Sequence, residues 1–220
     1  MLLAIDTATR LLSIALADDA AIIAEHSWYT HNQHSVALAA AVQRAIQQAG
    51  AIPADLTAIA VAQGPGSFTG IRIGMGVAKG LAQALQIPLV GVPTLDIIAA
   101  ASPHVEDDLT AVIQAGRGRI IAGRYGWQHG HWVPAGSPWL TTWPDLLEHI
   151  EAATLINGEI DETGVSFIAA SQQPLHMASL GLRLRRAGFL AHCARERLSR
   201  STETNPAHVV PIYLKQPSGD

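Results

Sequence analysis

The sequence predicts an α/β protein of two lobes, in which mixed sheets are flanked by helices. Three observations support this fold class. Three short apolar runs open the chain, two helical patterns separated by an apolar run follow, and a looser mixture of strand and helix patterns occupies the second half. With 220 residues, of which 49% are hydrophobic, the chain is long enough for one large domain or for two lobes of about 100 residues each.

The first predicted elements are three strands. Apolar runs at Leu2–Ile5, Leu12–Leu16 and Ala20–Ala24 are separated by the polar segments "DTATR" and "ADD". Short apolar runs bounded by polar turns are typical of strands that follow one another in an antiparallel meander. We therefore expect the chain to begin with three strands, with a tight polar turn after the first.

The next element is a helix over residues 35–49. Ser35 is a suitable N-cap, and Gly50 is a suitable stop. Apolar side chains recur at the spacing of one helical face. These residues are Leu38, Val42, Ala45 and Ala49.

A glycine-rich helix is predicted between two further strands. Residues 59–62 and 89–92 have the apolar character of buried strands, and residues 63–66 form a turn. Ser67 or Thr69 can cap a helix that runs to about Gln86, before Pro88. The first hundred residues therefore predict the order β-β-β-α-β-α-β, which is that of a ribonuclease-H-like lobe.

The glycines of this helix do not fit a nucleotide loop. Their spacing is one residue too long for the dinucleotide fingerprint, and Lys79 precedes Gly80 instead of following it as in a Walker A loop. They form two stripes instead, one at Gly70, Gly74, Ala78 and Ala82 and the other at Gly76, Gly80 and Ala84. Each interior glycine costs about 1 kcal/mol relative to alanine, so we expect close contact with a sheet, a helix or another chain to offset this cost.

The second half predicts a smaller, divergent lobe. We expect a hairpin that turns at residues 116–118, a short helix in residues 142–153, a strand at 166–171 and a helix at 178–187. The predicted division is residues 1–101 for the first lobe and 102–220 for the second, with the last ~15 residues as candidates to pack back on the first lobe.

Paired ribonuclease-H-like lobes form the architecture of actin, sugar kinases and Hsp70. In that architecture the first hairpin turn cradles phosphates, and a carboxylate at the turn helps to hold magnesium through water. Asp6, Thr7 and Thr9 occupy this turn, where they are candidates for a vestigial phosphate or nucleotide site. Asp6 can equally serve only to order its own turn.

Charge and cysteine content suggest a cytoplasmic protein. The net charge is −4, and the single cysteine, Cys193, fits a reducing compartment. Asp6 and Arg10 interrupt the apolar core that a signal peptide would need, and no run approaches the roughly 18 apolar residues of a membrane span. We therefore expect a soluble protein that is not associated with a membrane.

One basic stretch stands out from this acidic background. Residues 183–200 contain six arginines and one acid, Glu196. Arg183, Arg185 and Arg186 are candidates for contact with tRNA, although a solvated helical face explains the same charges because aromatic residues are not interleaved with them.

Four segments together resemble the TsaB family, also called YeaZ. They are "LLAIDTATRLLSIAL", "HSVALAAAVQRAIQQAG", "AIAVAQGPGSFTGIRIGMGVAKGLAQALQIPLVGVPTLD" and the closing "PIYLK". The resemblance is dense over residues 1–101 and thin afterwards. Where the family commonly has Asp-Ala-Arg followed by Glu, this chain has Gln114, Ala115 and Gly116, with Arg119 further on.

The resemblance implies a noncatalytic scaffold or activator subunit. Its partner would be the TsaD-like transferase that forms N6-threonylcarbamoyladenosine at position 37 of tRNA, in a heterodimer on which a TsaE-like ATPase acts. The resemblance also implies a helical bundle with that partner, and a homodimer through the same surface competes with it. The interface residues proposed on this basis are Leu38, Val42, Ala45, Gly70, Gly74, Gly76 and Ala78.

No cofactor or metal is expected. Where the transferase has its H-x-x-x-H metal motif, this chain reads Pro93 to Ile97, "PTLDI", and the pairs His31 with His34 and His129 with His131 lack a third ligand at helical spacing. Two enzymatic alternatives stay open, an ATP-dependent phosphotransferase and a metal-dependent glycopeptidase of the same superfamily. Asp96 would be the second carboxylate of an ATP site, or the cap of the helix that follows it.

Overall fold

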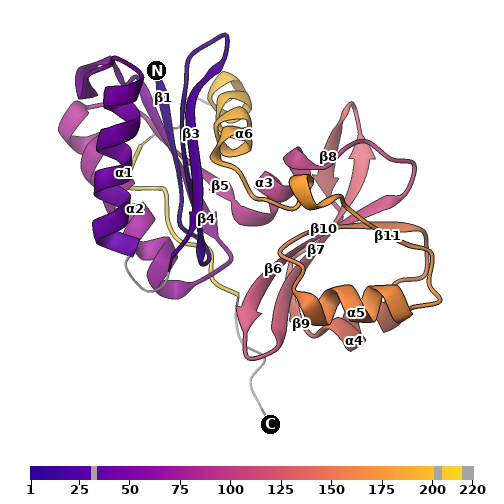
Figure 1. Cartoon of the computed structure of the whole chain (residues 1–220). Coiled ribbons are helices and arrows are strands. Elements are labelled where there is room, and N and C mark those ends of the chain that lie inside the picture. The colour runs from indigo at the N-terminus through magenta and orange to yellow at the C-terminus, as the bar shows by residue number, and fades with distance from the viewer. Residues whose placement is uncertain (31–33, 201–204, 215–220) are drawn as a thin grey trace. The chain divides into compact units, whose positions relative to one another are not determined.

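The computed structural model describes the backbone of residues 1–30, 34–200 and 205–214, with the side chains of all of these but 34–37. The chain forms two compact units (Figure 1). The first unit combines Met1–Ile97 with Arg186–Ile212, and the second combines Ile98–Arg185 with the described tail from Tyr213. Among the described residues, no helix is both long and apolar enough to cross a bilayer.

This division differs from the boundary that the sequence predicts at residue 101. The polypeptide leaves the first unit at Ile97 and returns to it at Arg186, so that a segment predicted to belong to the second lobe completes the first. The described part of the tail also contacts the first unit, because the Ile212 N–H donates to the Gln63 carbonyl at 2.8 Å and the Gln63 Nε2 donates to the Val210 carbonyl at 3.1 Å.

The first unit is built on a five-stranded mixed sheet of order β3-β2-β1-β4-β5. Its first three strands are antiparallel to one another, while β1, β4 and β5 are parallel. The strands are β1 (Leu2–Asp6), β2 (Leu11–Ala17), β3 (Ile22–Tyr29), β4 (Ala58–Gly64) and β5 (Leu89–Pro93). The predicted order of elements along the chain, β-β-β-α-β-α-β, is confirmed, although β3 lies later in the chain than the predicted 20–24.

Helices cover both faces of this sheet. Helices α1 (His34–Gln48) and α2 (Phe68–Leu85) lie on one face, and α6 (Ala187–Arg200) lies on the other (Figure 1). Because successive strand residues point to opposite faces, Leu3 and Ile5 pack toward α1 and α2, while Leu2 and Ala4 pack toward α6. A short 3-10 turn, Pro53–Asp55, precedes β4, and α3 (Thr94–Ala101) follows β5.

The second unit is built on a six-stranded sheet, in which five strands follow the order β11-β10-β6-β7-β8 and the sixth, β9, pairs with β7. Its strands are β6 (Asp108–Gly116), β7 (Arg119–Gln128), β8 (His131–Pro134), β9 (Trp139–Thr141), β10 (Thr154–Gly158) and β11 (Leu175–Met177). Helices α4 (Trp143–Glu148) and α5 (Glu162–Ala170) pack on it around the buried Trp143. The 116–118 hairpin and the short helix near 143 are confirmed.

Two predicted elements of this unit are wrong. Residues 166–171 are not a strand, because Asp161 caps α5 by accepting a hydrogen bond from the Gly164 N–H at 2.8 Å, and the bare Cα of Gly164 packs on Trp143. Residues 178–187 are not one helix, because only a 3-10 turn forms at Leu180–Leu182 and the helix begins at Ala187. In segments this short, the apolar pattern alone does not distinguish a helix from a strand, so the tertiary contacts decide between them.

Candidate functional site

The turn between β1 and β2 is closed by its own hydrogen bonds. Asp6, Thr7 and Thr9 are all buried, at 0%, 1% and 5% exposure. The Asp6 Oδ1 accepts a hydrogen bond from the Ala8 N–H at 2.9 Å, and the Thr9 Oγ1 accepts one from the Leu11 N–H at 3.2 Å. The polar groups of this candidate phosphate turn therefore stabilise the turn itself.

The α2 stripe that contains Gly70 and Gly74 lies against this same turn. The Thr7 Oγ1 donates to the Gly70 carbonyl at 2.7 Å, and the Ser67 N–H, at the helix N-cap, donates to the Ala8 carbonyl at 2.6 Å. A Cβ atom at Gly70 or Gly74 would overlap with Thr7. Glycine is needed at these two positions because the β1–β2 turn lies against the helix there. The glycine stripe and the polar turn, which are separate features in the sequence, are therefore in contact in the structure.

Most of the predicted interface residues face the sheet instead of solvent. Leu38, Val42 and Ala45 of α1 are between 0% and 6% exposed and pack into the core with Leu3 and Ile5. In α2, Gly70, Gly74 and Ala78 are also buried. Their apolar or small character reflects packing within the first unit, and of the predicted set Gly76 alone is exposed.

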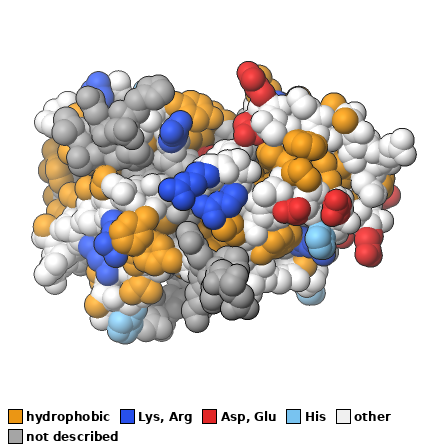
Figure 2. Space-filling view, turned by 90° about the horizontal axis from the view of Figure 1, so that it is seen from below, with side chains coloured by type: hydrophobic (Ala, Val, Ile, Leu, Met, Phe, Trp, Pro, Cys, Tyr) orange, Lys and Arg blue, Asp and Glu red, His pale blue; other side chains and the backbone are white. Residues whose placement is uncertain are grey.

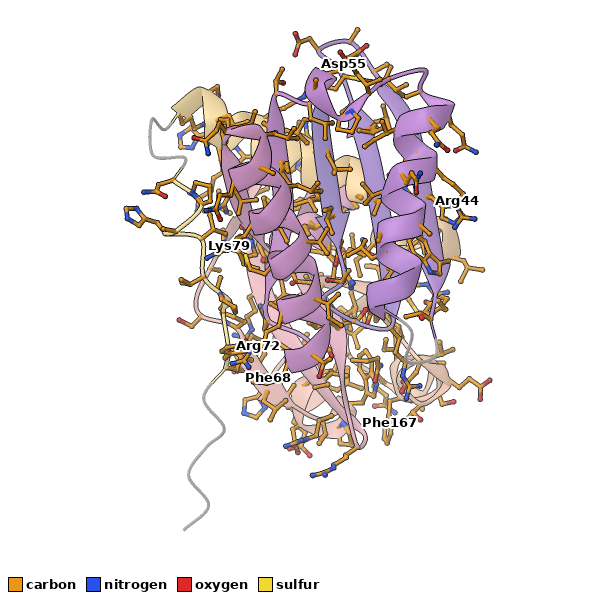
Figure 3. The ribbon with its side chains drawn as sticks, turned by 90° about the vertical axis from the view of Figure 1, so that its left-hand side faces the viewer. Arg44, Asp55, Phe68, Arg72, Lys79 and Phe167 are labelled. Carbon is orange, nitrogen blue, oxygen red and sulfur yellow. The ribbon has the colours of Figure 1, made fainter. Side chains whose placement is uncertain are left out.

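The outward face of α2 carries a row of residues at four-residue spacing, which we call the outer stripe. All five members are exposed: Phe68, Arg72, Gly76, Gly80 and Ala84. A Cβ atom added at Gly76 or Gly80 would meet nothing within 4 Å. The Arg72 guanidinium lies over the Phe68 ring, 3.8 Å from its centroid. Figure 3 shows Phe68, Arg72 and Lys79 along this helix, and Arg44 on the neighbouring α1.

The sequence indicates part of the outer stripe, since the spacing of Gly76, Gly80 and Ala84 is visible in it. The roles of Phe68 and Arg72 are not visible there, because an apolar residue followed by a cation four positions later also occurs on helices with a buried Phe. The exposure of Phe68, at 54%, distinguishes the two cases.

Each of the predicted RNA-binding arginines contacts another side chain of its own unit. Arg185 is buried, and its Nη1 lies 2.6 Å from the Glu159 Oε1. The Arg186 Nη1 lies 3.8 Å from the Glu25 Oε2, and the Arg183 Nη1 donates to the Met177 Sδ at 3.5 Å. Arg185 and Arg183 belong to the second unit and Arg186 to the first, so the three do not form one basic patch on either unit.

The residues that replace the metal motif do not fit a metal ion. The Asp96 Oδ2 pairs with the Arg197 Nη2 at 2.9 Å, and Thr94 is buried at the start of α3. His31 lies outside the described residues, as does the side chain of His34, and the His131 ring contacts the His129 carbonyl. Within the described ranges, no three His, Cys, Asp or Glu side chains are grouped as a metal site would need.

Comparison with known proteins identifies the family. A family model for tRNA N6-adenosine threonylcarbamoyltransferase, TsaD, matches residues 28–184. The protein named "tRNA threonylcarbamoyladenosine biosynthesis protein TsaB" in Bacillus subtilis is 36% identical over 160 residues, which cover 71% of this chain and 70% of that protein. The chain belongs to the TsaB family. The TsaB of Escherichia coli is 33% identical over 173 residues, which cover 66% of this chain and 74% of that one.

Solved structures agree with membership of the TsaB, or YeaZ, family. YeaZ from Pseudomonas aeruginosa superposes with a TM-score of 0.78 at 27% identity, and the match covers 97% of this chain and 99% of that one. A hexokinase of the ROK type from Thermus thermophilus gives a TM-score of 0.50 at 14% identity, which shows a shared fold. The predicted fold class of paired ribonuclease-H-like lobes is thereby confirmed.

Proposed function

We propose that this chain is a noncatalytic scaffold or activator subunit of the complex that forms N6-threonylcarbamoyladenosine at position 37 of tRNA. Its partner in this proposal is a TsaD-like transferase, in a heterodimer on which a TsaE-like ATPase acts. The names of its TsaB relatives support a role in the biosynthesis of this modified nucleoside. The match to a transferase family model supports a common origin with the proposed partner.

The observation that carries the proposal is the outer stripe of α2. A helix face that has glycine at two consecutive turns allows another helix to approach closely. The exposed glycines Gly76 and Gly80 contact nothing within the first unit that would offset their cost to the helix. Phe68 adds an exposed aromatic anchor at one end of the stripe. The stripe therefore has the small residues and the anchor that a helix–helix interface requires.

Charge favours a partner that is not a second copy of this chain. Helices α1 and α2 contain Arg44, Arg72 and Lys79 but no aspartate or glutamate. Two copies that met through this face would bring like charges together, which disfavours association. A partner helix that carries carboxylates would be attracted to it instead.

The closed turn supports a noncatalytic role. In an enzyme of this architecture the first hairpin turn would offer its polar groups to phosphate. Here the hydroxyl of Thr7 binds the carbonyl of Gly70, and the N–H of Ala8 binds Asp6. Isothermal titration of the purified protein with ATP and magnesium tests this part of the proposal, and tight binding would favour a phosphotransferase.

The interface is tested by adding a side chain to each glycine stripe. We expect Gly76→Leu to keep or slightly raise the melting temperature, because leucine favours the helix more than glycine does. The variant should abolish co-elution with the transferase in gel filtration, because a bulky group keeps the two helices apart. Gly74→Leu should instead lower stability by roughly 1 to 3 kcal/mol, since the new side chain overlaps with Thr7.

A matched control is Gly136→Leu, at a glycine of the second unit that also has open space around its Cα. This variant should fold as the wild type does and should still co-elute with the transferase. Co-elution of the Gly76→Leu variant with the transferase would show that the outer stripe is not the interface. Leu38→Arg should unfold the protein, because Leu38 is buried in the core.

A further inference from the structure

The hairpin between β6 and β7 ends in a two-residue turn with arginine at its first position. Gly116 pairs with Arg119 in the strand register, so Arg117 and Gly118 form the loop. Both loop residues have positive φ, 56° for Arg117 and 70° for Gly118. These angles are those of a type I′ turn, whose first position strongly prefers Asn, Asp or Gly.

Arginine is a poor residue for that first position. The left-handed conformation brings the Cβ of an L-residue close to its own carbonyl oxygen, and Arg has no short polar group with which to compensate locally. Strain of this kind persists where a side chain has a function that a relaxed residue could not perform. The Arg117 side chain is exposed at the hairpin tip, so it does not offset the strain by packing.

The hairpin tip also carries unneutralised positive charge. Neither Arg117 nor Arg119 forms an ion pair with a carboxylate of the described residues, and the Arg119 Nε is buried without a hydrogen-bond partner among them. The carboxylate that reaches this hairpin, Glu159, binds the Arg185 guanidinium at 2.6 Å and accepts from the Gln114 N–H at 3.1 Å.

The surroundings of the tip point to a phosphate backbone instead of a protein. A protein interface is anchored by apolar or aromatic side chains at its centre, whereas Gly116, Arg117 and Gly118 are all exposed and offer only backbone and a guanidinium. Guanidinium groups bind phosphate oxygens through two parallel N–H donors. On the face drawn in Figure 2, exposed Lys and Arg side chains are present.

We propose that Arg117 and Arg119, at the tip of the β6–β7 hairpin, bind the phosphate backbone of RNA. The proposal rests on the proposed function, in which the RNA is a tRNA. It differs from the contact predicted at Arg183, Arg185 and Arg186, of which Arg185 is buried against Glu159 and Arg186 lies near Glu25. The contact is independent of base sequence, since a guanidinium on a phosphate carries no sequence information.

The test uses a variant that relaxes the turn while it removes the charge. Fluorescently labelled tRNA is titrated, at several salt concentrations, with the full chain alone and with the full chain plus a TsaD transferase. We expect Arg117→Asn to raise the melting temperature by about 2 °C, because Asn suits the type I′ turn. The same variant should weaken tRNA binding and reduce the slope of log K against log salt by about 1.

Arg119→Gln should likewise reduce the slope by about 1. The matched control is Arg200→Gln, at an exposed arginine in the last turn of α6, which should leave affinity and slope unchanged. Unchanged tRNA affinity and slope in Arg117→Asn would overturn the proposal, as would the absence of tRNA binding by both the wild-type chain and its complex. Loss of transferase association with unchanged tRNA binding would assign the tip to a protein contact instead.

The wild-type complex is also assayed for formation of the modified nucleoside by mass spectrometry. If the wild-type complex modifies tRNA while Arg117→Asn binds tRNA as the wild type does, the hairpin proposal fails and the proposed function stands. If the wild-type complex binds tRNA through the hairpin but supports no modification, the proposed function fails and the RNA contact stands.

Discussion

At the scale of single residues, several charged and polar side chains are buried together with a partner. The ion pair of Arg185 with Glu159 has 0% and 10% side-chain exposure, and Glu159 also binds the backbone and side chain of Gln114. A buried pair contributes little net stability relative to apolar residues, but the loss of one member leaves an uncompensated charge. These residues therefore tolerate removal of a partner poorly.

Glu159→Gln should destabilise the protein by about 3 to 5 kcal/mol, because it removes the carboxylate that pairs with the buried Arg185 guanidinium. Urea denaturation followed by circular dichroism measures this change. Glu162→Gln, at an exposed position in the first turn of α5, is the control and should change stability by less than about 1 kcal/mol. Similar effects of the two substitutions would show that the buried pair does not require its charge.

The Cys193 thiol should be unreactive in the folded protein. Burial, followed by the negative charges of Asp96 and Glu196, raises the pKa of this thiol from 9.0 to about 12. The nucleophilic thiolate is therefore scarce at pH 8, and we expect iodoacetamide to alkylate the native protein far more slowly than the protein in 6 M urea.

The raised pKa also makes stability depend on pH. The unfolded chain releases this proton at a lower pH than the folded protein does, so the thiol's contribution is present below about pH 9 and is lost as the pH rises toward 12. Cys193→Ala should flatten this part of the stability profile. Equal alkylation rates in native protein and in urea would contradict the partial burial and raised pKa of Cys193.

At the scale of elements, helix α6 is attached to the first sheet at its N-terminus. The Ala187 N–H donates to the Ser13 Oγ at 2.8 Å, and the Gly188 N–H donates to the Glu25 Oε1 at 2.6 Å. Two strands thus satisfy the first N–H groups of a helix that lies more than 150 residues away in the sequence. The negative charge of Glu25 also suits the positive end of the helix dipole.

Ser13→Ala should lower stability by about 1 to 3 kcal/mol, because the buried Ala187 N–H loses its acceptor. Ser27→Ala provides the matched control, since the Ser27 hydroxyl binds Ser13 at 2.7 Å without contacting the helix. Its effect should be smaller, because Ser13 can still accept from Ala187. Hydrogen exchange at the Ala187 amide, measured by NMR, should accelerate in the first variant and not in the second.

At the scale of the whole molecule, the first unit is formed by two segments that are far apart in the sequence. The first unit is complete only when residues 186–212 return to it. Helix α6 then covers the sheet face formed by Leu2, Ala4 and their neighbours, with Ala187, Leu190, Ala191 and Ala194 all buried. The lobe that the sequence predicts, residues 1–101, lacks this cover.

A chain that ends at residue 101 should therefore fail to fold stably, because one apolar face of its sheet is left in water. A variant that joins residues 1–97 to residues 186–212 through a flexible linker should regain a cooperative thermal transition, measured by circular dichroism. A cooperative transition of the 1–101 chain with the stability of the linked variant would show that α6 is not needed for the first unit.

The sequence by itself determined much of the first unit. Apolar runs, the cap at Ser67 and the stop near Gln86 are local signals, so the strands, the two long helices and their order along the chain could be predicted from them. Motif similarity over residues 1–101 also identified the family. In the second unit, the short segments near 166–171 and 178–187 have apolar patterns that suit either helix or strand, and their tertiary contacts decided between them.

Only the tertiary structure decided which side of each helix is free. Gly74 and Gly76 are equivalent in sequence, yet one lies against Thr7 and the other faces solvent, because the β1–β2 turn covers a single side of α2. Arg185 and Arg117 likewise appear as equal charges in the sequence. The fold surrounds one with Glu159 and core residues and leaves the other at a hairpin tip, because charge pairing depends on segments that are distant along the chain.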